Sequence, residues 1–195
     1  MTTTVSGLFD NRADATQAVR DLQALGVSRD DISVVSPNDG EIDDDMADTS
    51  DAAADAGAGA GIGAAVGGLG GLLTGLGIMA IPGVGPVVAA GWLAATAVGA
   101  AAGAVVGGAT GGIVGALTEA GVPERDANVY AEGVRRGSTL VTARVDDSQA
   151  DAAQVVLRDT NSVDLNLRRA DYERGGWTRF DPDAPIEPRR SEPRI

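Results

Sequence analysis

Three hydroxyl side chains in the second half of the chain are candidates for nucleophilic chemistry: Ser138, Thr139 and Ser148. Such a hydroxyl attacks a substrate only when a neighbouring base takes its proton, and that base is most often His. The 195-residue chain has no His, no Cys and no Lys, and all 15 of its basic residues are Arg. Imidazole, thiol and Schiff-base chemistry are therefore excluded. We expect structural caps and surface groups at these positions, and no enzyme.

Residues 38–55 carry eight carboxylates and no basic residue, a composition that suits either a cation site or a solvated linker. A Ca²⁺ loop of the EF-hand type needs a turn glycine that is preceded by oxygen ligands at fixed positions. With Gly40 at that turn, Val35 and Pro37 fall where the first two ligands belong. We therefore predict an acidic linker and no metal site.

Charge and glycine spacing exclude two further classes of ligand. The net charge is -13 and the pI about 4.2, without the basic stripe that phosphate backbones require, so no nucleic acid is expected. No G-x-G-x-x-G spacing occurs in residues 57–115, and a chain without Lys cannot form a Walker motif. The sequence predicts no cofactor and no small-molecule substrate.

The central segment, residues 56–118, contains no charged side chain. The sequence IPGVGP at residues 81–86 divides it into two arms, residues 57–81 and 87–118. In each arm glycines recur every four residues, which places them on one stripe of a helix and lets two helix backbones pack closely. The helix-packing and oligomerisation residues that we predict are Gly59, Gly63, Gly67, Gly71, Gly75, Gly99, Gly103, Gly107, Gly111 and Gly115.

This glycine-rich helical hairpin has two interpretations. Both arms exceed the roughly 20 helical residues that cross a bilayer, so the first is a hairpin that inserts in or lies against the cytoplasmic membrane and contacts lipid. Because all Arg residues flank the hairpin, both termini are expected in the cytoplasm. The first arm is mostly Gly and Ala, so the second interpretation is a soluble cytoplasmic homo-oligomer with a buried Gly/Ala core. A sensory module for a small ligand is a third, based on fold analogy alone.

The segments before and after the glycine-rich hairpin together predict one small α+β domain of ferredoxin-like type. It is made of two βαβ units with helices on one face of the sheet. In the first unit, strands Thr4–Phe9 and Ile32–Val35 enclose one helix. Asp10 or Asn11 can cap the start of this helix, and Gly26 suits its end.

The second unit follows the central segment. Pro123 in a first turn opens a helix, and Thr139–Val145 is predicted to be a strand. Ser148 and Asp151 form a capping-box signature before another helix. The apolar alternation over residues 163–167 predicts the last strand.

The domain organisation that follows has five parts. The last part, a tail over residues 171–195, has two interpretations. It is either a disordered segment or a peptide that docks Trp177 and Phe180 on the domain or on a partner. The parts are residues 1–37 (first half of the α+β domain), 38–55 (acidic linker), 56–118 (glycine-rich hairpin), 119–170 (second half of the domain) and 171–195 (tail rich in Pro and Arg).

Both halves of the predicted domain resemble a known family. Residues 121–153, GVPERDANVYAEGVRRGSTLVTARVDDSQADAA, resemble the second half of the bacterial heat-induced or general stress protein domain of the YflT type. Residues 4–36, TVSGLFDNRADATQAVRDLQALGVSRDDISVVS, are similar to its first half, and GGWTRFDP at residues 175–182 is similar to the aromatic tail of some members. The resemblance implies a glycine-zipper insertion and a role in stress tolerance, with no catalytic activity.

Overall fold

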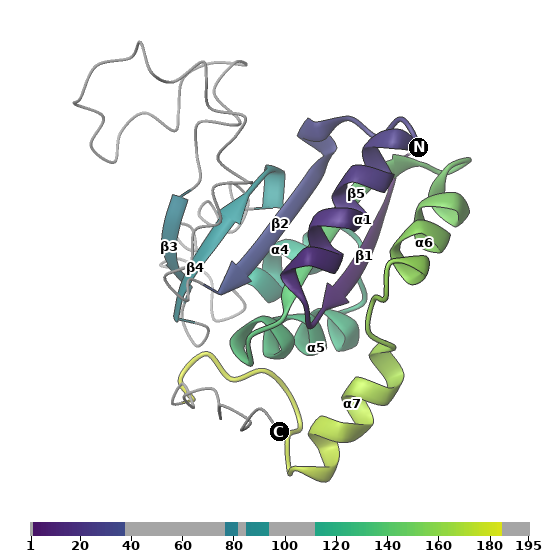
Figure 1. The fold of residues 1–195 in the computed structure, drawn as a ribbon. Helices are drawn as coiled ribbons and strands as arrows, with labels where there is room; N and C mark the ends of the chain where they lie inside the picture. The colour runs from purple at the N-terminus through teal and green to yellow at the C-terminus, as the bar shows by residue number, and fades with distance from the viewer. Residues whose placement is uncertain (1, 38–76, 82–84, 94–111, 185–195) are drawn as a thin grey trace, which may run out of the picture.

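The computed structural model describes residues 2–37, 77–81, 85–93 and 112–184 of the chain (Figure 1). These residues form both helices and strands. In order they are β1 (Thr2–Phe9), α1 (Arg12–Ala24), a short 3-10 helix (Arg29–Asp31), β2 (Ile32–Pro37), β3 (Gly77–Ile81), β4 (Gly85–Ala90), α4 (Ile113–Glu119), α5 (Glu124–Arg135), β5 (Thr139–Asp146), α6 (Ala150–Asp159) and α7 (Leu165–Arg174).

The strands form one sheet in the order β1-β5-β2-β4-β3. β5 lies between β1 and β2 and is antiparallel to both, so β1 and β2 run parallel and α1 connects them. β4 pairs antiparallel with β2, and β3 pairs antiparallel with β4. β1 and β3 are therefore the two edges of the sheet (Figure 1).

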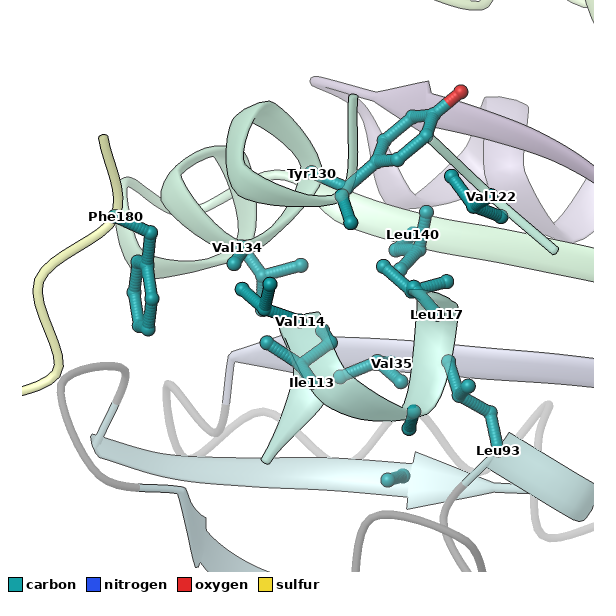
Figure 2. Packing of buried hydrophobic residues seen from close by; sticks show 14 of the residues in the cluster. Val35, Leu93, Ile113, Val114, Leu117, Val122, Tyr130, Val134, Leu140 and Phe180 are labelled. Carbon is teal, nitrogen blue, oxygen red and sulfur yellow. The ribbon is translucent and has the colours of Figure 1, made fainter. Parts of the chain in front are cut away.

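Helices cover both faces of the sheet, which corrects the prediction that they lie on one face. Successive side chains of a strand point to opposite faces, and the neighbours Leu8 and Phe9 are both fully buried. Phe9 packs in a cluster with Leu22 of α1 and Leu157 of α6. Leu8 packs in a second cluster with α4 and α5, part of which is seen in Figure 2. The domain thus has three layers.

The first predicted unit is confirmed as strand, helix and strand. Asn11 caps α1, since its side chain accepts a hydrogen bond from the backbone N–H of Ala13 at 2.9 Å. Gly26 follows the helix with a φ of +97°, a value that glycine adopts without strain. Local sequence signals are sufficient to explain both ends of this helix.

The helices of the second unit differ from the prediction at their ends. α5 begins directly after Pro123 and β5 forms, both as expected. The capping box is wrong: Ser148 is exposed in a turn, and Gln149 is the residue before α6. Backbone hydrogen bonds such as Gln149 N to Asp146 O, 2.8 Å, form that turn instead.

The predicted last strand is also wrong, because α7 begins within residues 163–167. The Asp164 side chain accepts hydrogen bonds from the N–H groups of Asn166 and Leu167, and so caps a helix. Leu167 is 68% exposed, so the alternation of apolar residues over 163–167 does not correspond to the buried face of a strand. The mixed α and β content holds, but within the described residues the second βαβ unit lacks its final strand, so the ferredoxin-like arrangement is not confirmed.

The middle of the predicted helical hairpin is a β-hairpin formed by β3 and β4. The helix prediction is therefore wrong for the end of the first arm and the start of the second. β4 continues the sheet through Ala89, which lies opposite Val35 of β2. The β-branched pair Val87 and Val88 suits a strand, and sheet pairing satisfies backbone groups that an isolated helix end would leave open. The chain then turns at Gly91, where an added Cβ would lie 2.3 Å from the carbonyl oxygen of Ile32.

The end of the second arm is helical as predicted, but it belongs to the core of the domain. Ile113, Val114 and Leu117 of α4 are buried in the cluster that contains α5 (Figure 2). Gly115 lies half-buried in α4. The acidic linker and the remaining predicted glycines lie outside the described residues: Gly59, Gly63, Gly67, Gly71, Gly75, Gly99, Gly103, Gly107 and Gly111. Among the helices that the structure describes, none combines the length and apolar character that crossing a bilayer requires.

Candidate functional site

A polar network lies at the end of the sheet where β1 ends and β5 begins. Asp10 directly follows β1, Ser138 directly precedes β5, and Arg168 lies on α7. Ser138 Oγ donates to one carboxylate oxygen of Asp10 at 2.8 Å, and Arg168 forms an ion pair with the other. Three elements that are distant in the sequence meet at one carboxylate.

The protonation of Asp10 follows from these contacts. Partial burial alone would raise the pKa of Asp10, but the hydrogen bonds from Arg168 and Ser138 favour the charged form and lower it overall. A carboxylate with a lowered pKa and both oxygens engaged is a weak base. Ser138 therefore has a carboxylate partner that the sequence did not reveal, but this partner is poorly suited to activate a hydroxyl.

The other two predicted hydroxyls occupy different surroundings. Thr139 lies beside Ser138, and its Oγ1 is 3.0 Å from the hydroxyl of Ser36 at the end of β2. Arg12 of α1 donates to that Ser36 hydroxyl at 3.2 Å. Ser148 is exposed at the opposite end of β5. The structure brings Ser138 and Thr139 together and leaves Ser148 apart.

A buried carboxylate, Glu132 of α5, extends the network. Its side chain is fully buried and accepts two hydrogen bonds from Arg135, at 2.6 and 2.9 Å, and one from Arg136 at 2.6 Å. A buried charge needs such partners, because desolvation would otherwise be costly. No motif in the sequence marked Glu132, although an acid three and four residues before two arginines is the spacing of helical ion pairs.

Tyr172 of α7 connects this ion-pair cluster to the C-terminal tail. The guanidinium of Arg136 lies 4.3 Å from the centroid of the Tyr172 ring, a cation–π distance. Burial raises the pKa of Tyr172, and the nearby Arg168 and Arg136 oppose that shift. The ring of Trp177 packs edge-on against Tyr172 with centroids 5.6 Å apart.

The tail therefore docks on the domain as far as Phe180, which supports the second of its two interpretations. Phe180 is 9% exposed and enters the core cluster near Val134 of α5 (Figure 2). Its backbone N–H donates to the side chain of Asn128 at 3.1 Å. Residues 185–195 lie outside the described residues.

A second polar contact anchors the chain where it leaves β4. Trp92 Nε1 donates to the backbone carbonyl of Asp31 at 3.1 Å, and the guanidinium of Arg144 lies 4.4 Å from the Trp92 ring. Together with Gly91, these contacts hold the start of the second arm against β2 and β5.

Metal binding finds no support in the part of the chain that the structure describes, where no group of three His, Cys, Asp or Glu side chains is placed to hold an ion. The acidic run over residues 38–55, where a cation was considered, is outside that part.

The geometry thus defines a three-layer domain of mixed helix and antiparallel strand, in which Asp10 and Glu132 are paired with arginines. Residues 4–84 match the family model described as heat induced stress protein YflT domain. The match includes the strand, helix and strand of residues 4–36 and confirms the resemblance there, whereas residues 121–153 lie beyond it. No curated protein and no solved structure gives a significant match. Residues 4–84 are thus similar to a stress-protein domain, and this similarity supports a stress-associated role.

Proposed function

We propose that this protein is a non-enzymatic, stress-associated scaffold that works as a homo-oligomer. The main support is that the described parts of the central segment belong to the domain itself. β4 is a strand of its sheet, and Ile113 and Leu117 of α4 lie in its core. A segment held in this way is better placed for contacts between protein copies than for entering a bilayer as an independent hairpin.

The polar network supports the non-enzymatic part of the proposal. Asp10 and Glu132, the two carboxylates at its centre, are each neutralised by arginines. An active site needs a group left free to exchange protons or attack a substrate. Here the same groups join α5, α7 and the ends of β1 and β5, which is a stabilising role.

The oligomeric state of the full-length protein tests the proposal. Prepared without detergent, the protein should have a mass that is a multiple of the 19.5 kDa chain in sedimentation or light scattering. The paired substitutions Gly67→Leu and Gly107→Leu should lower that mass, because each Leu keeps helix backbones apart. Ala65→Leu, two residues from the nearest stripe glycine, serves as the matched control.

Two results would contradict the proposal. A monomer at all concentrations would exclude a homo-oligomeric scaffold. Recovery of the protein only in the membrane fraction, released by detergent alone, would favour the membrane hairpin instead.

A further inference from the structure

The two edges of the sheet differ in how their backbone groups are used. At the β1 edge, the Ser6 carbonyl accepts a hydrogen bond from the hydroxyl of Tyr130 at 3.1 Å, and the Leu8 carbonyl accepts one from the N–H of Val163 at 2.7 Å. Figure 2 shows the Tyr130 hydroxyl pointing out of the apolar cluster. The loop after α6 and a side chain of α5 therefore block β1 from pairing with another strand.

The β3 edge has a different pattern. Among the described residues, β3 pairs only with β4. Ala80 lies opposite Pro86, which has no N–H to donate, so this pair cannot exchange two hydrogen bonds. Bonded and non-bonded pairs alternate in an antiparallel ladder, so Met79 and Val87 form the bonded pair next to Ala80 and Pro86. Ile78 and Ala80 then direct their N–H and C=O groups outward, away from β4 and toward the free side of β3.

From this pattern we infer that β3 pairs antiparallel with β3 of a second copy and joins two sheets into one. The inference rests on the proposed homo-oligomer and adds to it an interface that is separate from the helix contacts tested at Gly67 and Gly107. The outward groups of Ile78 meet those of Ala80 of the partner subunit, and the reverse pair forms by symmetry. The two-fold axis passes beside Met79, as an isologous contact requires.

Charge favours a second copy as the occupant of this edge. The chain carries a net charge of -13, so most of its surfaces would repel an identical surface. The three strands nearest the edge, β2, β4 and β3, contain no charged residue. An uncharged edge strand is also the type that pairs with another strand unless it is covered.

Single cysteines test the register, because the chain has no native Cys. Met79→Cys places two thiols directly across the axis in a non-bonded pair, with Cα atoms about 4.5 Å apart, which suits a disulfide. Ile81→Cys places them about 13 Å apart along the strands, from four steps of 3.3 Å. Mild oxidation of the full-length protein should give a covalent dimer with Met79→Cys and none with Ile81→Cys.

Ile78→Pro provides an independent test. It removes an outward N–H and leaves the inward bonds to β4 in place, so the dissociation constant for self-association should rise about tenfold or more. Ile78→Val is the control and should leave that constant unchanged. Circular dichroism spectra of both variants should match that of the wild type.

The outcomes separate this inference from the proposed function. An oligomer that survives Ile78→Pro and gives no Met79→Cys dimer overturns the β3 interface and leaves the scaffold proposal standing. The same result is expected if another segment of the chain covers β3. A monomeric wild-type protein overturns both.

Discussion

Ser138 donates a hydrogen bond to Asp10 at 2.8 Å, although the two residues are 128 positions apart in the sequence. The bond joins the start of β5 to the end of β1, beyond their last ladder pair, Phe9 with Thr139. Arg168 adds α7 to the same carboxylate. Asp10 is thus the point at which the C-terminal helix is held to the sheet.

Asp10→Asn should lower the free energy of unfolding by about 1 kcal/mol at neutral pH, because a largely exposed ion pair and a charged hydrogen bond are lost. The pKa of Asp10 is lowered in the folded protein, so the charged carboxylate stabilises the fold above the ordinary value of 3.8. That stabilisation is lost as the pH falls through the native pKa. Urea denaturation across this range should show the difference between wild type and variant shrinking below pH 3.8, whereas the exposed Asp30→Asn should change stability by less than about 0.5 kcal/mol.

Glu132→Ala should destabilise the domain more strongly, by about 3 kcal/mol. The substitution removes a fully buried carboxylate and leaves Arg135, whose side chain is only 15% exposed, without its ion-pair partner. Thermal or chemical unfolding measures the loss. Glu173→Ala, at an exposed position of α7, is the control, and an equal effect of the two substitutions would show that the buried ion pairs are unimportant.

Gly91→Ala tests whether β4 is held against β2 in the way described. The new Cβ would lie 2.3 Å from the Ile32 carbonyl oxygen in a residue whose φ is +92°, so steric overlap adds to backbone strain. A loss of about 3 kcal/mol is expected. Gly121→Ala has nearly the same φ, +91°, and no atom within 4 Å of the new Cβ, so it measures the strain alone, about 1 kcal/mol. Equal losses would argue against the close contact of Gly91 with β2.

Phe180→Ala should release the tail from the core. Losing a buried aromatic side chain costs about 2 kcal/mol here, because the freed tail exposes a surface without leaving a closed cavity. Limited proteolysis after Arg179 should become faster, and hydrogen exchange in α4 and α5 should increase. Trp92→Phe, a substitution in the same cluster that leaves the tail contacts in place, should not speed that cleavage.

Signals that act within a few residues allowed several elements to be predicted from the sequence. Asn11 before α1, Gly26 after it and Pro123 before α5 each act through their own backbone geometry or side-chain hydrogen bonds. Ala127, Tyr130 and Val134 also follow helical spacing in the sequence, and all three are buried on α5. The family resemblance over residues 4–36 followed from the same segment and is confirmed by the match over residues 4–84.

Other features depended on contacts between distant residues and could not be predicted in that way. An uncharged, glycine-rich stretch is compatible with helix or strand, and pairing with β2 made residues 85–90 a strand. The sequence also could not show that Asp10 lies beside Ser138, or that α4 and the tail containing Phe180 complete one core. By itself the sequence determined both ends of α1, the start of α5 and the similarity of the first unit to the stress-protein domain, because those depend on neighbours along the chain. The tertiary structure decided the sheet order, the second layer of helices and the polar network, because each depends on the pairing of segments that the sequence keeps far apart.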